Sequence, residues 1–129
     1  MPEGSHILII DDAFSNLHLL QSILESDGYS VIPVDDGRKA LEIVKESKDI
    51  GLILLDIMMP NFDGYQFLDQ MKEIDEKNIP VIVVSAKTDT QSIQTALEKG
   101  AYDYLSKPFN IQDVLNKIRP AINGSGGRR

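Results

Sequence analysis

Five short apolar runs alternate along this 129-residue chain with five segments whose apolar residues repeat at helical spacing. The runs cover residues 7–10, 31–34, 52–55, 81–84 and 102–105. Three of them are almost unbroken Ile, Leu and Val, which is typical of parallel strands covered on both faces. Strands and helices that alternate in this way predict right-handed crossovers, and therefore an α/β fold in which helices cover both faces of a parallel sheet.

The helical segments carry one apolar stripe each, as a helix packed on a sheet does. The stripes are Leu17, Leu20 and Leu24; Ala40, Leu41 and Val44; Phe67, Leu68, Met71 and Ile74; Ile93, Ala96 and Leu97; and Ile111, Val114, Leu115, Ile118 and Ile122. Three polar residues stand where helices should begin and are predicted N-caps: Asp36, Asp63 and Asn110. Three glycines follow helical patterns and are predicted to end them in left-handed conformation: Gly28, Gly51 and Gly100.

The length fits one domain, predicted to span residues 6–122. Residues 1–5 and 123–129 are expected to be flexible ends. The second is rich in glycine and is interpreted as a linker stub or a cloning remnant, and the first as partly a cloning remnant.

Composition excludes several classes of protein. The net charge of −7 argues against direct binding of nucleic acid, which is a polyanion bound mainly by Lys and Arg. The chain has no cysteine, so disulfides and thiolate metal sites are excluded. No apolar run approaches the roughly 20 residues that span a bilayer, and the first residues do not resemble a signal peptide. We therefore expect a cytoplasmic protein without a membrane partner.

Ligands of such sheets bind beyond the carboxyl ends of the strands. Side chains able to do chemistry follow four of the five apolar runs: Asp11 and Asp12 after the first, Asp56 after the third, Ser85 after the fourth and Lys107 after the fifth. A single Asp after a strand is usually a turn or cap residue, and Asp35 with Asp36 is assigned to that class. An acid pair, a lone acid, a hydroxyl and a lysine at these four ends together indicate a site.

The chemistry of this set points to phosphoryl transfer. If the first and third strands are neighbours, three carboxylates converge, and their oxygens suit Mg²⁺. Lys107 would offset the carboxylates at rest and pair with phosphoryl oxygens afterwards, while Ser85 offers a second donor. A carboxylate can attack phosphorus and hold the product as an aspartyl phosphate. Asp56 is the expected nucleophile because it stands alone, whereas Asp11 and Asp12 can hold metal.

Residues 6 to about 122 resemble the receiver domain of two-component response regulators. The resemblance rests on four motifs: Ile9-Ile10-Asp11-Asp12; Leu54-Leu55-Asp56-Ile57-Met58-Met59-Pro60 with Asp63-Gly64; Val84-Ser85-Ala86; and Lys107-Pro108-Phe109. It implies a flavodoxin-like fold with strand order 2-1-3-4-5.

The resemblance also implies a role for each site residue. Asp56 is then the phosphoacceptor, and Asp11, Asp12 and Asp56 bind Mg²⁺, or Mn²⁺ as a substitute, together with the backbone carbonyl of Met58. Ser85 is the switch hydroxyl, Tyr104 the switch aromatic and Lys107 the phosphate-contacting lysine. Met58 and Lys87 flank the path of attacking water and would tune the lifetime of the phosphoryl group. The Lys107–Pro108 bond is expected to be cis, so that Lys107 points into the site.

By the same resemblance, the chain accepts its phosphoryl group from a histidine kinase or a histidine phosphotransfer protein. It then switches the surface made by the fourth helix, fifth strand and fifth helix toward an output domain or partner protein. It is not expected to be an enzyme, beyond catalysing its own phosphorylation and dephosphorylation.

Two alternatives stay open. A Mg²⁺-dependent phosphatase of the haloacid dehalogenase type also forms an aspartyl phosphate, but it resembles D-x-D, and Met58 stands where its second Asp would be. A receiver-like adaptor that never takes phosphate usually lacks an acid or the lysine, and none is missing here.

Overall fold

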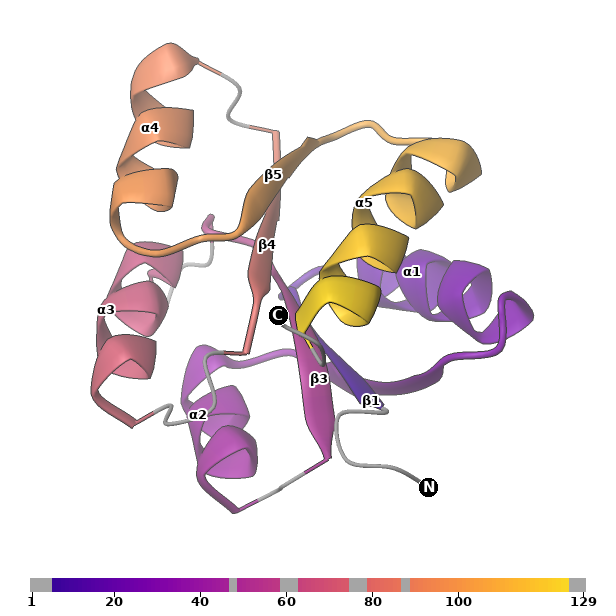
Figure 1. Cartoon of the computed structure of the whole chain (residues 1–129), viewed down its shortest axis with the longest axis horizontal. Coiled ribbons are helices and arrows are strands. Elements are labelled where there is room, and N and C mark those ends of the chain that lie inside the picture. The colour runs from indigo at the N-terminus through magenta and orange to yellow at the C-terminus, as the bar shows by residue number, and fades with distance from the viewer. Residues whose placement is uncertain (1–5, 47–48, 59–62, 75–78, 87–88, 126–129) are drawn as a thin grey trace.

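The computed structural model describes residues 6–46, 49–58, 63–74, 79–86 and 89–125 (Figure 1). Five strands alternate with five helices along these residues. The strands are β1 (His6–Ile10), β2 (Ser30–Val34), β3 (Ile50–Leu55), β4 (Val81–Ser85) and β5 (Asp103–Ser106). The helices are α1 (Phe14–Ser26), α2 (Gly37–Glu46), α3 (Gly64–Ile74), α4 (Thr90–Glu98) and α5 (Ile111–Ser125). The predicted order of elements is confirmed, and each strand lies within two residues of its predicted run.

The five strands form one parallel sheet in the order β2-β1-β3-β4-β5, as the resemblance implied. The order reverses at β1, which pairs with β2 on one side and with β3 on the other. At the carboxyl ends, Ile10 pairs with Leu55, so the residues that follow these two strands start side by side. This is the switch point at which open α/β sheets bind ligands.

Alternate side chains of the strands feed two separate apolar cores. In Figure 1, α1 and α5 cover one face of the sheet, and α2, α3 and α4 cover the other. The strand residues facing α1 and α5 include Ile7, Ile9, Leu52, Leu54, Ile82 and Val84. Those in the second core include Leu8, Ile10, Ile53, Leu55, Val81 and Val83. Burial on both faces explains why the central strands are continuous apolar runs rather than alternating ones.

The predicted N-caps are confirmed by their hydrogen bonds. The Oδ1 of Asp36 accepts the N–H of Arg38 at 2.7 Å, and the Oδ1 of Asp63 accepts the N–H of Tyr65 at 2.7 Å. The Oδ1 of Asn110 accepts the N–H of Asp113 at 2.8 Å. Each side chain satisfies a donor that the first turn of a helix leaves unpaired.

Two of the three predicted glycine stops are confirmed, and one is wrong. Gly28 and Gly100 have φ of 92° and 107°, conformations that residues with a Cβ rarely adopt. Gly51 instead lies inside β3, because that strand begins at Ile50, ahead of its run of Leu and Ile.

At the other end of the chain, α5 continues to Ser125, three residues past the predicted end of the domain at residue 122.

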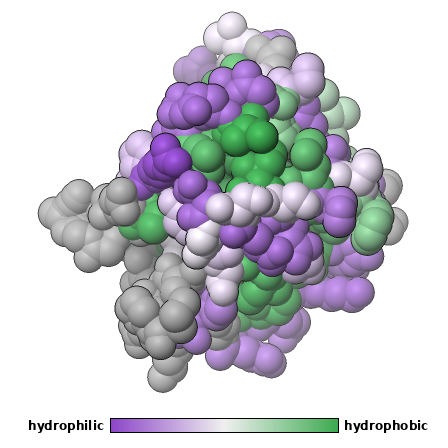
Figure 2. Space-filling model, turned by 90° about the vertical axis from the view of Figure 1, so that its right-hand side faces the viewer, coloured by the Kyte–Doolittle hydropathy of each residue, from purple (hydrophilic) through white to green (hydrophobic). Residues whose placement is uncertain are grey.

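Within the described residues, no helix is long and apolar enough to cross a membrane. The face of the molecule that looks right in Figure 1 carries hydrophobic residues in separate patches, with hydrophilic residues between and around them (Figure 2). The larger apolar side chains are therefore not gathered into one continuous band on this face.

The structure predicts that two phenylalanines contribute very differently to the free energy of unfolding. Phe67 on α3 is fully buried, whereas Phe14 on α1 is 80% exposed. We expect Phe67→Ala to lower the free energy of unfolding by about 3–5 kcal/mol, because it removes buried apolar surface and leaves a cavity. Phe14→Ala should change it by less than about 0.5 kcal/mol. Urea denaturation of the two variants measures both values, and equal losses would contradict the assignment of Phe67 to the core.

Candidate functional site

Three carboxylates meet at the carboxyl ends of β1 and β3. The N–H of Asp56 donates to the carbonyl of Ile10 at 2.9 Å, which extends the pairing of the two strands by one residue. One carboxylate oxygen from each of Asp11, Asp12 and Asp56 lies within 4.8 Å of the other two. The predicted convergence is therefore confirmed, and it follows directly from the adjacency of β1 and β3.

Lys107 places its ammonium between the two buried carboxylates of this group. Its Nζ lies 3.0 Å from Oδ2 of Asp11 and 3.1 Å from Oδ2 of Asp56. The side chains of Asp11 and Asp56 are only 2% and 8% exposed. The lysine follows β5, and its backbone N–H donates to the carbonyl of Ser85 at 2.9 Å, so β4 sets the direction from which it enters. The Lys107–Pro108 peptide bond is cis, as predicted.

Burial and charge oppose each other in this group. Burial raises the pKa of the Asp56 carboxyl, while the N–H of Met58 and the charge of Lys107 act to lower it. Burial also disfavours the charged form of Lys107, but its hydrogen bond to Asp11 and the charges of Asp56 and Asp11 outweigh burial and raise the pKa of Lys107. The ammonium is therefore held in its charged form, and it offsets part of the repulsion between the carboxylates.

The donor set fits a hard divalent cation. Asp12 is exposed, so the cluster opens to solvent on its side, while Asp11 and Asp56 close the site from within. All three donors are carboxylate oxygens, which suit Mg²⁺. The chain also turns back beside Asp56, where the N–H of Met58 donates to Oδ1 of Asp56 at 2.9 Å. The N–H of Met58 thus lies beside the Asp56 carboxylate.

Ser85 and Tyr104 lie together on the neighbouring strands β4 and β5. Ser85 is fully buried at the end of β4, and Tyr104 is also buried although β5 is an edge strand. Burial raises the pKa of the Tyr104 hydroxyl, and a hydrogen bond with the Ser85 side chain opposes this rise. The tyrosine ring is thus turned inward, and its hydroxyl is bonded to the serine predicted to be the switch hydroxyl.

Two further predictions concern Met58 and Lys87, the residues expected to tune the lifetime of the phosphoryl group. The Met58 side chain is 53% exposed. Lys87 lies outside the described residues. One contact between helices was not predicted from the sequence: the Tyr65 hydroxyl of α3 donates to the backbone carbonyl of Ser92 in α4 at 3.3 Å. Ser92 is in turn bonded to Asp89, whose carboxylate caps α4. The Asp89 cap stands three residues before Ser92 and could have been found from its sequence pattern, whereas the contact with Tyr65 has no local signal.

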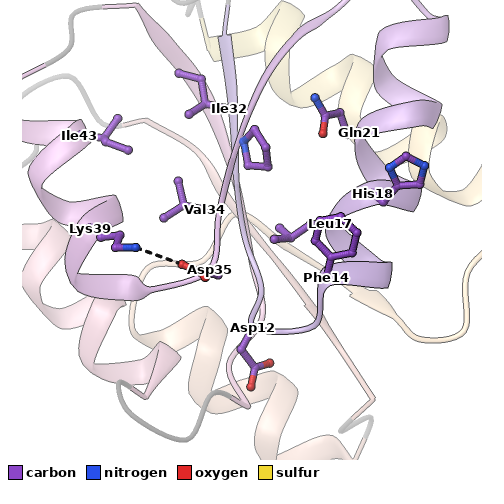
Figure 3. Close-up of a pocket in the computed structure, with 11 residues that line it drawn as sticks. Asp12, Phe14, Leu17, His18, Gln21, Ile32, Val34, Asp35, Lys39 and Ile43 are labelled. Carbon is purple, nitrogen blue, oxygen red and sulfur yellow. Dashed lines mark ion pairs between the residues drawn. The ribbon is translucent and has the colours of Figure 1, made fainter.

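A cavity of about 500 Å³ lies beside the acidic cluster, between α1, β2 and α2 (Figure 3). Its walls are mainly apolar and include Leu17, Ile32 and Val34. Asp12 stands at one end, with its carboxylate directed away from this apolar wall (Figure 3). Asp12 is thus the member of the acidic cluster that lines this cavity, whereas Asp11, Asp56 and Lys107 do not line it.

Comparison with known proteins identifies the family. The family model of the response regulator receiver domain matches residues 7–119. The chain belongs to this family. A receiver domain protein of rice, two-component response regulator ORR3, is 36% identical over 110 residues, which cover 84% of each chain. The "uncharacterized transcriptional regulatory protein YkoG" of Bacillus subtilis is 36% identical over 124 residues, which cover 96% of this chain and 54% of YkoG. The receiver chain thus spans about half the length of this relative.

Solved receiver domains share the fold. The beryllofluoride-activated NtrC4 receiver domain dimer gives a TM-score of 0.86 at 33% identity and covers 94% of this chain and 98% of that one. The signal receiver domain of a signal transduction histidine kinase from Syntrophus aciditrophicus gives a TM-score of 0.83 at 30% identity. The aligned region covers 93% of this chain and 91% of that one. Both likenesses extend over almost the whole chain, which agrees with a single domain of flavodoxin-like type.

The position of Lys107 predicts a large effect of removing it. Lys107→Ala leaves Asp11 and Asp56 buried without their cation, and we expect the free energy of unfolding to fall by about 3 kcal/mol. The control is Lys99→Ala, which breaks a two-oxygen contact with Asp69, a side chain that is 53% exposed. This loss should be at most about 1 kcal/mol. Urea denaturation near neutral pH without divalent ions measures both values. If Lys99→Ala lowered the free energy of unfolding as much as Lys107→Ala does, the prediction would be refuted.

Proposed function

We propose that this receiver domain takes a phosphoryl group onto Asp56 from a histidine kinase or a histidine phosphotransfer protein. The observation that carries the proposal is the position of the Asp56 carboxylate. It lies within 4.8 Å of two further carboxylates, and its Oδ2 is 3.1 Å from the ammonium of Lys107. Phosphoryl transfer needs little more from a protein than in-line positioning and positive charge around the equatorial oxygens.

In the proposed reaction, an Asp56 oxygen attacks phosphorus and forms a P–O bond. The bond from phosphorus to the donor's imidazole nitrogen breaks, and its electron pair stays on that nitrogen. The ammonium of Lys107 is already 3.0 Å from Asp11 and can turn from carboxylate to phosphoryl oxygen without leaving the site. The chain therefore catalyses only steps that begin or end at its own Asp56.

Asp11, Asp12 and Asp56 would hold Mg²⁺, or Mn²⁺ in its place, together with the backbone carbonyl of Met58. When bound, the ion supplies positive charge to the phosphoryl oxygens. The support for this assignment is the all-oxygen donor set, with Asp12 open to solvent and Asp11 buried beneath. Asp11 keeps its orientation because its Oδ1 accepts the N–H of Ala13 at 2.9 Å.

The phosphoryl group would act through Ser85 and Tyr104. A hydroxyl that donates to a phosphoryl oxygen can no longer keep the same geometry with Tyr104, so the two states differ in how this pair is arranged. Tyr104 lies in β5, between α4 and α5. We therefore assign the output to the surface of α4, β5 and α5, where Leu97 of α4 and Tyr102, just before β5, are exposed apolar side chains. An output domain or a partner protein would bind there, in the cytoplasm.

The first test is the site of labelling. We expect acetyl phosphate with Mg²⁺ to add one phosphoryl group to the wild type and none to Asp56→Asn, because only Asp56 combines a carboxylate with the cation and Lys107. Asp35→Asn is the matched control, since this acid also follows a strand but is exposed and paired with Lys39. Intact-mass measurement shows which of the three proteins takes up a phosphoryl group. An equal mass increase in Asp56→Asn would overturn the assignment, and sustained turnover of an aryl phosphate would favour a phosphatase.

The second test concerns the lifetime of the phosphoryl group. Met58, two residues after Asp56, has a half-exposed apolar side chain that cannot orient an attacking water. We expect a long-lived phosphoryl state, and Met58→Asn to shorten its half-life severalfold because an amide can orient water in line. Met58→Leu is the control and should keep the wild-type half-life. Autodephosphorylation is followed by intact mass, and equal half-lives in Met58→Asn and the wild type would show that Met58 shields nothing.

A further inference from the structure

The first residue of α3 packs tightly against the residue that follows the proposed phosphoacceptor. The N–H of Gly64 donates to the carbonyl of Ile57 at 3.3 Å. A Cβ added to Gly64 would lie 2.4 Å from the Cα of Ile57, and 2.7 and 2.8 Å from its Cγ2 and Cβ. Such distances are too short for non-bonded carbon atoms, whose optimal separation is about 3.5–4.0 Å. Either Gly64 or Ile57 must move to accommodate any side chain.

The need for glycine here is spatial and does not come from backbone conformation. The glycines with positive φ in the described residues are Gly28 and Gly100, and Gly64 is not among them. Alanine has the higher helix propensity, so Gly64→Ala would otherwise favour α3. A loss caused by this substitution must therefore come from the contact with Ile57.

Helix α3 cannot easily retreat from this contact. Its side chains Phe67, Leu68 and Met71 are buried in the core beneath α2, α3 and α4. The helix is also bonded to α4 at two places, through Tyr65 and through the contact of Asp69 with Lys99. Withdrawing the helix would disturb all of these contacts at once.

A shift at Ile57 would reach the site directly. Ile57 is bonded to Asp56 on one side and to Met58 on the other, and the Met58 N–H donates to Oδ1 of Asp56 at 2.9 Å. The Asp56 backbone is fixed from the other side by its bond to Ile10 in β1. The short segment 56–58 is therefore held between the sheet and the first residue of α3. Its position sets both the Asp56 carboxylate and the backbone of Met58.

We propose that Gly64 is a positioning residue for phosphoryl transfer: by having no side chain, it lets α3 press on Ile57 and hold segment 56–58 in the geometry that binds the cation and presents Asp56. The inference rests on the proposed function of Asp56. Gly64 touches neither the cation nor the phosphoryl group, and it acts only through Ile57.

The test compares Gly64→Ala with Gly28→Ala. Gly28 has φ of 92° and nothing within 4 Å of an added Cβ, so its substitution strains the backbone away from the site. Mg²⁺ affinity is measured by NMR titration well below the melting temperature, and the labelling rate is measured at saturating acetyl phosphate and Mg²⁺. We expect Gly64→Ala to weaken both by about tenfold or more, as small displacements of reacting groups do. Gly28→Ala should lower the melting temperature and leave both unchanged.

A second variant separates the backbone of Ile57 from its side chain. Ile57→Ala removes the Cγ2 that a new Cβ would meet at 2.7 Å, but it keeps the Cα at 2.4 Å. Adding Ile57→Ala to Gly64→Ala should therefore leave Mg²⁺ affinity and labelling impaired. Full recovery in the double variant would mean that the contact only involves the side chain, and it would overturn the proposal.

The outcomes distinguish this inference from the proposed function. If acetyl phosphate does not label Asp56 in the wild type, the proposed function fails. If the wild type is labelled and Gly64→Ala matches it in rate and in Mg²⁺ affinity, the positioning role of Gly64 fails alone. If Gly64→Ala does not fold, the NMR titration of the wild type with Mg²⁺ tests the proposal instead. Its Gly64 and Ile57 amide signals should shift with the same Mg²⁺ midpoint as that of Met58, and unshifted signals would overturn the proposal.

Discussion

The ammonium of Lys107 between Asp11 and Asp56 is the interaction on which the functional end of this molecule depends. Two carboxylates that are almost completely buried would repel each other and favour protonation. One cation placed 3.0 and 3.1 Å from them offsets part of this repulsion. A buried ion pair of this kind contributes little net stability, because desolvation offsets much of the Coulomb attraction. Its effect is to bring the cation of Lys107 and two carboxylates together at one edge of the sheet, beside the exposed Asp12.

Strand order explains how residues 45 to 96 positions apart come together. β1 lies between β2 and β3, so the acids that follow β1 and β3 share one edge of the sheet. β5 lies two strands from β3, beyond β4, and Lys107 is long enough to cross that distance. A shorter cation after β5 would not reach Asp56. The same edge carries Ser85 from β4, so four strands contribute to one site while their other residues build the two cores.

Much of this could be predicted from sequence, because it depends on local patterns. The runs of Ile, Leu and Val located the strands, and the polar residues after four of the five runs located the site. The N-caps Asp36, Asp63 and Asn110 were predictable because a cap bonds to residues two or three positions away. The helix end predicted at Gly51 was wrong because a glycine ahead of an apolar run has the same local pattern whether it ends a helix or lies within a strand.

The remaining features depend on distances between segments far apart in the chain. The bond from Tyr65 to Ser92 joins residues 27 positions apart, and neither residue has a neighbour that signals it. The 2.4 Å approach of an added Cβ to Ile57 likewise depends on how deeply α3 seats in the core. The strand order and the cis bond before Pro108 were inferred from resemblance to a family, since no local propensity selects either of them.

Helix α4 is attached to the domain differently from the other four helices. The other helices each bury several side chains of their own, whereas α4 buries only Ser92 and Ala96, neither of which carries much apolar surface. Ile93 of α4 packs partly buried against the core, and polar contacts also hold the helix, from Tyr65 at one end and between Lys99 and Asp69 at the other. Hydrogen bonds and exposed ion pairs exchange readily with water, so breaking them costs about 1 kcal/mol each. Displacing α4 would therefore expose less apolar surface than displacing any of the other four helices, and most of both apolar cores would stay in place.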